Sequence, residues 1–290
     1  MKKPIVVKKP TIKRKSKVKK GVSFLSGKGW FYFLISLFIL GLLTGVYHYR
    51  INLAYYFSFI SRHHDFKENL EERRLSNLRN HQVLQKHDGK VVGFDVSEYQ
   101  GDIDWTLVNK IEDIYPLGFV FIRASVGKDR VDKQFETNWI GSKKRKIIRG
   151  AYHYYRPNES ALKQADLFIK TVSLQKGDLP PVLDIEQLPE SQSLDSLKVG
   201  LRRWLKKIDE HYKVKPIIYT GERYYVDFLK AEFSDYSFWI ANYNYNVIEI
   251  RENWMFWQFT EKASFLGIKG NVDLNIYNGT PKMLRYQTIN

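Results

Sequence analysis

Residues 180–187 read PPVLDIEQ, and this stretch is the best starting point for the fold. Its apolar run is interrupted by Asp184 and followed at once by Glu186. An unpaired carboxylate is costly to bury, and residues two apart on a strand share one face. The stretch therefore predicts a buried strand that ends with two carboxylates on the same side.

Similar apolar and β-branched runs recur along the chain, and segments of helical character separate the first five of them. The predicted strands are 91–97, 118–125, 147–155, 180–186, 215–221, 238–243, 255–260 and 272–278. The predicted helices are 105–114, 134–146, 160–172, 194–212 and 223–230. The clearest helix is 194–212, in which large apolar residues recur at i, i+3 and i+4 spacing.

Continuous apolar strands that alternate with helices predict a parallel sheet covered on both faces. Eight such strands in about 200 residues favour a compact α/β barrel, similar to a TIM barrel, that loses its outer helices near the end. The alternative is an open, doubly wound sheet. No G-x-G-x-x-G sequence opens the first unit, so a dinucleotide site is not expected.

The net charge of +16 belongs mainly to the N-terminal tail. Thirteen Lys and Arg residues lie in residues 1–64, which contain no acid, so residues 65–290 carry a net charge of +3. A nucleic-acid-binding domain needs a basic face on the fold itself, and we expect none here. The chain has no Cys, which excludes disulfides, thiolate metal sites and a Cys nucleophile.

Residues 29–49 contain no Lys, Arg, Asp or Glu and carry aromatic residues at both ends. This length and pattern predict a transmembrane signal anchor, with a cleaved signal peptide as the alternative. The basic tail of residues 1–28 is expected in the cytoplasm, which places the rest outside as a single-pass protein of the cell membrane. Residues 50–88 are predicted to form a helical stalk, whose His63, His64, His81 and His87 are expected at a solvated surface.

Four acids fall at the ends of predicted strands: Asp95, Asp184, Glu186 and Asp273. In a parallel barrel the site is built from the carboxyl ends of several strands, and the first three acids fit that rule. Asp273 lies at the beginning of its strand. It fits this rule only if that strand runs differently from the others or if the site lies lower in the barrel. Clustered carboxylates raise one another's pKa values, and such a pair can protonate a leaving oxygen and stabilise a developing cation, as glycoside cleavage requires.

Two other chemistries are alternatives to acid/base glycoside cleavage: a metal hydrolase and a Ser–His–acid triad. A metal hydrolase could use the acids with His153, but no H-x-H or H-x-x-x-H pair follows residue 90. A Ser–His–acid triad is weaker still, because no G-x-S-x-G elbow is present. Arg123 could pair with one of the acids, and aromatic residues near strand ends could stack on sugar rings, although most such residues fill a core.

The sequence resembles glycoside hydrolase family 25, the muramidases. The resemblance rests on eight segments in that family's order: GFDVSEYQGDIDW (93–105), FVFIRASVG (119–127), RGAYHYYRP (149–157), PPVLDIE (180–186), PIIYTG (216–221), FWIANY (238–243), FWQFT (256–260) and VDLNIYNG (272–279). It implies an irregular barrel of five β/α units and three further strands, here residues 89–290. It also implies cleavage of the β-1,4 bond between N-acetylmuramic acid and N-acetylglucosamine in peptidoglycan, without a metal or other cofactor.

The resemblance implies roles for individual residues. Glu186 resembles the general acid, Asp184 the acid that assists it, and Asp95 and Asp273 the flanking carboxylates of the groove. Asp184 acts either as nucleophile or by steadying the substrate's acetamido group, and we favour the second role. The residues expected to contact substrate are Tyr154, Tyr219, Trp239, Asn242, Trp257 and Gln258.

The sequence therefore predicts a membrane-anchored peptidoglycan hydrolase whose partners are glycan strands and, through residues 29–49, the lipid bilayer. A second hypothesis is a catalytically idle protein that keeps the barrel for binding peptidoglycan. A binding protein has no need of the D-x-E pair, which favours the enzyme. The sequence does not define the oligomeric state.

Overall fold

The computed structural model describes residues 30–45, 47, 70–111 and 114–289. The chain divides into two compact units, Met1–Lys67 and Glu68–Asn290. In the first unit, residues 30–45 form a helix. No helix within the described part of the chain combines the length and the apolar character needed to cross a membrane. The basic tail, and residues 29, 46, 48 and 49 of the predicted anchor, lie outside the described residues.

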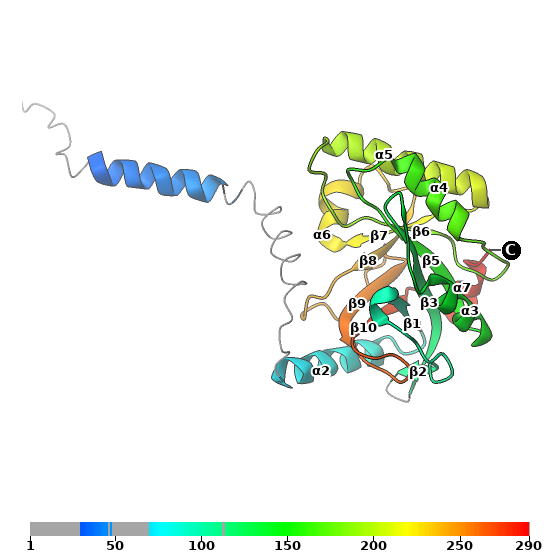
Figure 1. Ribbon diagram of the computed structural model, residues 1–290. Coiled ribbons are helices and arrows are strands. Elements are labelled where there is room, and N and C mark those ends of the chain that lie inside the picture. Colours follow the sequence, from blue (N-terminus) through cyan, green and yellow to red (C-terminus); the bar gives the residue numbers. More distant parts are fainter. Residues whose placement is uncertain (1–29, 46, 48–69, 112–113, 290) are drawn as a thin grey trace, which may run out of the picture. The chain divides into compact units, whose positions relative to one another are not determined.

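The second unit is an α/β barrel closed by eight strands, which confirms the barrel prediction (Figure 1). Around the ring, each strand pairs with the next and the last pairs with the first. In ring order the strands are β1 (Val91–Val96), β3 (Tyr115–Val126), β5 (Ile148–Tyr154), β6 (Val182–Asp184), β7 (Ile217–Gly221), β8 (Ser237–Ala241), β9 (Phe256–Ala263) and β10 (Val272–Tyr277).

One strand of the ring runs against the others. Every pairing from β1 through β3 to β9 is parallel, whereas β10 is antiparallel to both of its neighbours, β9 and β1. An antiparallel neighbour needs only a short connection, whereas a parallel one needs a long crossover. This explains why the segment between β9 and β10 is too short for a helix.

The interior of the barrel is filled mainly by aromatic side chains. The rings of Phe119, Phe121, Tyr152, Tyr219, Trp239, Phe256 and Tyr277 belong to one buried cluster. Two glycines make room for them: a Cβ on Gly93 would lie 2.6 Å from the Phe119 ring, and one on Gly150 would lie 2.6 Å from the Phe121 ring. A close-packed interior of this kind is a core and not a pore.

Helices cover the outside of the parallel strands (Figure 1). They are α3 (Phe135–Lys144), α4 (Ala161–Thr171), α5 (Leu194–Tyr212) and α6 (Glu222–Tyr224) with the π-helical turn η2 (Tyr225–Leu229). A last helix, α7 (Pro281–Tyr286), follows β10, and its Leu284 packs against the interior cluster. The predicted helix 194–212 has the bounds of α5. The Ser193 side chain caps it by accepting from the Ser196 backbone N–H at 3.1 Å, and its apolar stripe from Leu197 to Ile208 is buried.

The predicted helix 105–114 is not seen in its described residues, 105–111 and 114. Residues 105–107 turn, and β2 (Lys110–Ile111) pairs with the start of β3 as a hairpin. The buried residues Trp105, Val108 and Ile111 recur every three positions, which imitates a helical stripe. A further two-stranded pairing, β4 (Arg130–Val131) with the end of β3, was also absent from the prediction.

The second part of the segment predicted as a stalk is helical, but it packs on the barrel. Helix α2 (Leu70–Lys86) lies against β9, and Arg79 donates hydrogen bonds to the carbonyls of Phe259 and Val247. Val83 and Leu84 are buried. Residues 50–69 lie outside the described residues.

His87 was expected at a solvated surface, and that expectation is wrong. The residue follows α2 and is 6% exposed. Its ring packs edge-on against Trp257 at 5.8 Å, and its Nε2 accepts from the Ile250 backbone N–H at 3.2 Å. Burial lowers the pKa of His87, which keeps the ring neutral in this contact.

We predict that α2 belongs to the cooperative folding unit of the barrel. Leu84→Ala in the full chain should lower the free energy of unfolding by about 2–4 kcal/mol, because it leaves a cavity under the helix. Denaturant unfolding followed by Trp fluorescence measures this change. Leu78→Ala, at a half-exposed position of the same helix, is the matched control and should change it by less than about 0.5 kcal/mol. Equal effects of the two substitutions would contradict the prediction.

Candidate active site

The four acids predicted from strand ends meet at one edge of the barrel. Asp95 lies near the carboxyl end of β1, Asp184 ends β6, and Glu186 follows two residues later. Asp273 lies at the start of β10, and because β10 is antiparallel to β1, Asp273 is directly opposite Asp95. The structure thus shows why an acid at the beginning of a strand joins acids at the ends of others.

Electrostatic coupling shows that the acids share one environment. The charge of Glu186 acts on Asp95, and those of Asp95, Asp184 and Asp273 all act on the Tyr152 hydroxyl. Asp95 and Asp184 are buried, whereas Glu186 and Asp273 are half-buried. Two carboxylates therefore lie in the floor of the site, and the other two are more accessible to a substrate.

A chain of amide groups holds Asp95. Its Oδ2 accepts from Asn275 Nδ2 at 2.8 Å and from Gln258 Nε2 at 2.7 Å, and the same Gln258 nitrogen lies 3.3 Å from Asp273 Oδ2. Asn275 Oδ1 in turn accepts from the Trp239 indole N–H at 2.8 Å. Charge-assisted hydrogen bonds of this kind stabilise an ionised carboxylate in a buried position.

Two opposing effects set the pKa of Asp95. Burial, the larger effect, raises it, and so does the charge of Glu186, while the hydrogen bonds from Asn275, Gln258 and Asp273 lower it. The result is a pKa of about 6, compared with 3.8 for an ordinary Asp. Asp95 therefore changes its charge close to neutral pH.

Three of the predicted substrate contacts lie near the acids. In the sheet register Asp184 is beside Tyr154 on β5 and Tyr219 on β7, and Tyr219 is beside Trp239 on β8. Tyr154 is half-buried, so its ring is accessible to a ligand. Tyr219 and Trp239 are 6% and 1% exposed, and they support the floor of the site from inside the barrel.

The other three predicted contacts are placed differently. Trp257 is fully buried on the outer face of β9, where its indole N–H donates to the Asn242 carbonyl at 3.0 Å. The Asn242 side chain donates to Glu222 and accepts from the Asn244 backbone N–H. Gln258, although it bonds to two of the acids, is only 2% exposed. Strand alternation puts Trp257 and Gln258 on opposite faces, which the sequence pattern alone could have indicated.

The sequence interpretation overlooked Asn275 and Tyr152 as members of the site. Asn275 is two residues after Asp273 in the same strand, so the two share the inward face. Tyr152 is paired in register with Arg123 on β3 and is buried. The alternation of side chains between the two faces of a strand was the signal that could have identified both residues.

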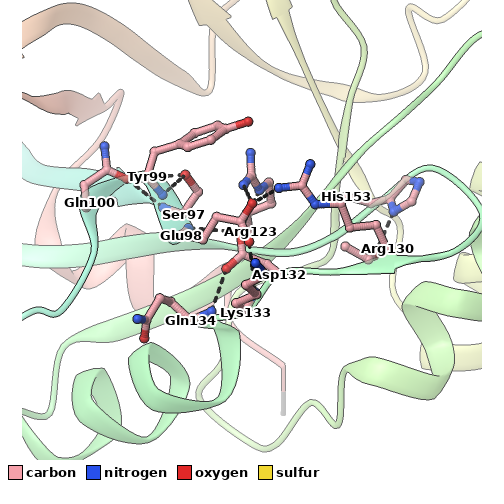
Figure 2. A network of polar contacts seen from close by, with 11 residues as sticks. Ser97, Glu98, Tyr99, Gln100, Arg123, Arg130, Asp132, Lys133, Gln134 and His153 are labelled. Atoms are coloured by element: carbon pink, nitrogen blue, oxygen red, sulfur yellow. Dashed lines mark hydrogen bonds and ion pairs between the residues drawn. The ribbon is translucent and has the colours of Figure 1, made fainter.

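Arg123 pairs with acids outside the four. Its Nε donates to Asp132 at 2.7 Å, and its Nη2 lies 3.4 Å from Glu98, which also pairs with Arg130 (Figure 2). The guanidinium lies 4.6 Å from the centre of the Tyr99 ring. This network attaches the short 3₁₀ turn η1 (Glu98–Gln100), which follows Asp95 along the chain, to strands β3 and β4.

His153, considered above as a ligand in the alternative metal hydrolase, is fully buried on the outside of the barrel wall. Its ring stacks on Trp204 at 5.6 Å, and its nitrogens bond Ser125 at 2.8 Å and Gln164 at 3.1 Å. Burial lowers the pKa of His153 to about 4. Within the part of the chain that the structure describes, no three His, Cys, Asp or Glu side chains are grouped to hold a metal ion.

The raised pKa of Asp95 makes a prediction about stability. The folded protein holds this proton up to pH about 6 and the unfolded chain loses it near pH 4, so wild-type stability falls between these values. Asp95→Asn should therefore gain stability relative to wild type above pH 7, by about 2–3 kcal/mol. Below pH 4 that gain should vanish. Denaturant unfolding at pH 4 and pH 8 measures it, and an equal difference at both pH values would contradict the prediction.

The fold and sequence are similar to those of known proteins. Residues 94–268 match the family described as glycosyl hydrolases family 25. An uncharacterised protein of Escherichia coli K12, YegX, is 40% identical over 67% of this chain and 71% of its own length. Lysozyme M1 of Streptomyces globisporus is 31% identical over 67% of this chain and 70% of its own.

Solved structures agree with these relatives. A family 25 glycosyl hydrolase from Bacillus anthracis superposes with a TM-score of 0.62 at 28% identity, covering 70% of this chain and 95% of that one. A bacterial lysozyme from Streptomyces coelicolor gives a TM-score of 0.62 at 28% identity, covering 69% and 98%. With the barrel and its acid cluster in place, these similarities lead to one conclusion: the chain belongs to glycosyl hydrolases family 25 and is a glycoside hydrolase.

Proposed function

We propose that the protein is an N-acetylmuramidase that hydrolyses the β-1,4 bond between N-acetylmuramic acid and N-acetylglucosamine in peptidoglycan. The observation that carries this proposal is the convergence of Asp95, Asp184, Glu186 and Asp273 at one edge of the barrel. Relatives named as lysozymes support the choice of peptidoglycan as substrate.

In this proposal Glu186 is the general acid. Glu186 is half-buried and can reach a bound glycan, whereas Asp184, at the end of β6, is buried. Glu186 gives its proton to the leaving oxygen as the bond from that oxygen to the sugar's anomeric carbon breaks. The neighbouring carboxylates stabilise the positive charge that develops on the sugar ring.

We assign Asp184 to the acetamido-assisted route. The carbonyl oxygen of the substrate's own acetamido group forms the new bond to the anomeric carbon, and Asp184 accepts the acetamido N–H and holds the group in place. Water then attacks the same anomeric carbon, and the bond between that carbon and the acetamido oxygen breaks. The attacking water gives a proton to Glu186, which restores the acid. The alternative is direct attack by Asp184, which would form a covalent sugar ester on this residue.

Substitution of Glu186 tests the catalytic assignment. Glu186→Gln in the full chain should lower the release of new reducing ends from purified peptidoglycan by at least about 100-fold, because the amide has no proton to donate. Glu190→Gln, at an exposed position four residues further on, is the matched control and should retain activity. Equal release by wild-type protein and Glu186→Gln would overturn the assignment.

The same assay separates the alternatives. Binding to peptidoglycan without any release of reducing ends by wild-type protein would favour the catalytically idle binding protein. Loss of wild-type activity on addition of a chelator, with recovery on addition of a divalent cation, would favour the metal hydrolase. The muramidase proposal predicts that a chelator has no effect.

We also propose that residues 29–49 anchor the protein in the cell membrane, with the basic tail inside and the barrel outside. The support is the charge-free apolar sequence and the exposed apolar side chains of the described helix, such as Phe38 at 72% and Leu40 at 60%. Contiguous apolar surface of this kind is stable in lipid and not in water.

Fractionation tests the anchor. The full chain should stay with the membrane pellet after a carbonate wash, and added protease should reach the barrel only from the outer side. A Leu37→Arg, Leu40→Arg double variant should be released, because each charge at the centre of a span costs about 2.5–3.5 kcal/mol. Wild-type protein found in the soluble fraction would contradict the proposal.

A further inference from the structure

Gln258 connects two of the four acids. This residue of β9 is 2% exposed, and its side-chain nitrogen lies 2.7 Å from Asp95 Oδ2 and 3.3 Å from Asp273 Oδ2. Asp95 and Asp273 are paired opposite one another on neighbouring strands. The amide nitrogen therefore lies between the two carboxyl groups, within hydrogen-bonding distance of both.

Two tyrosines fix the direction of this amide. The Tyr219 hydroxyl donates to Gln258 Oε1 at 2.7 Å, and the Tyr243 hydroxyl donates to the same oxygen. An amide oxygen only accepts and an amide nitrogen only donates, so the two hydroxyls keep the oxygen on their side and the nitrogen on the side of the acids. Tyr219 belongs to β7 and Tyr243 follows β8, so two separate segments hold the Gln258 side chain in one orientation.

The charged and titratable groups around Asp95 explain why the orientation of the Gln258 amide is important. From β10 it faces Asp273, from the end of β6 it is affected by Glu186, and Tyr152 of β5 is coupled both to Asp95 and to Asp184. Arg123 of β3 is the positive charge coupled to Tyr152, but its own ion pairs are with Asp132 and Glu98. Asp95 is thus buried among acids, and the hydrogen bonds that offset this environment come from the amides of Gln258 and Asn275 and from the carboxyl group of Asp273.

We propose that Gln258 is a positioning residue of this site: held by Tyr219 and Tyr243, its amide keeps the Asp95 carboxylate charged and in place beside Asp273. This inference rests on the proposed muramidase function and adds to it a residue that acts through Asp95 and not by touching the glycan. The charged Asp95 contributes to the negative potential that favours a cationic transition state. This positioning role of Gln258 replaces the direct substrate contact that the sequence predicted for it.

The direct test follows the ionisation of Asp95 itself. Carbon-13 NMR of the full chain, labelled at aspartate Cγ and assigned with Asp95→Asn, gives the pKa of this carboxyl in each variant. Gln258→Met keeps the length of the side chain and removes the donor, so the pKa of Asp95 should rise by about one unit from its value of about 6. Tyr243→Phe, which loosens the amide without removing it, should raise the pKa by a smaller amount.

Gln164→Met is the matched control. Gln164 is also fully buried, and its amide bonds His153 and the backbone of Arg156 outside the barrel wall, away from the acids. Its loss should lower stability and leave the pKa of Asp95 unchanged. An unchanged pKa in Gln258→Met, or an equal rise in Gln258→Met and Gln164→Met, would overturn the proposal.

Activity gives a second, separate readout. If the protein hydrolyses peptidoglycan, the acid limb of its kcat/KM profile should move to higher pH in Gln258→Met, because Asp95 then gains its proton at higher pH. A uniform loss of activity with the limb in place would point to a structural role and would contradict the inference. If wild-type protein shows no hydrolysis, the proposed function fails, while the NMR titration still decides the role of Gln258.

Discussion

The structure depends on the way β1 closes the barrel. This strand pairs in parallel with β3 on one side and antiparallel with β10 on the other, so the ring is completed by its one reversed strand. The reversal has a chemical consequence, because it brings the start of β10 to the carboxyl end of β1. Without it, Asp273 would lie at the opposite end of the barrel from Asp95, and the cluster would lack one of its four acids.

The closed ring also explains how buried acids are tolerated. Below them the aromatic rings fill the interior, and the last inward-facing layer is a polar network that joins Trp239, Asn275, Asp95, Gln258 and two tyrosines. Burial disfavours the charge on Asp95 and the amide donors favour it, and the balance leaves its pKa near neutrality. Burying the charge of Asp95 lowers the stability of the fold, and an apolar residue in its place would avoid this cost. Active sites commonly reduce stability in this way.

Much of this arrangement was predictable from the sequence, because the strands are apolar runs with acids at defined positions. PPVLDIEQ correctly indicated a buried strand, but the strand ends at Asp184 and Glu186, predicted within it, lies two residues beyond. The rule that a barrel site is built at the carboxyl ends of its strands indicated a common edge for Asp95 and Asp184. The direction of β10 was left open, because a single strand pattern carries no information about its partner. Trp257 was expected at the groove but is buried on the outer face of β9 beside α2, and the alternation of side chains along the strand was the signal that the prediction did not use.

Other features depended on contacts that are distant in the sequence. Helix α2 has no wide apolar stripe, so its attachment through Arg79 and the buried His87 could not be read from periodicity. The false helix at 105–114 arose because three buried residues at a spacing of three suit both a helix and this turn with its hairpin. The role of Gln258 required knowledge of four partners on four other strands or loops.

Under the proposed function, the acid cluster cleaves the glycan so that N-acetylmuramic acid carries the new reducing end. The most direct measurement is to digest purified peptidoglycan with the full chain, reduce the products with borohydride and identify the sugar at each new reducing end. Reduced N-acetylmuramic acid should be the product, and it should be absent with Glu186→Gln. New ends of reduced N-acetylglucosamine, or the same products from both proteins, would contradict it.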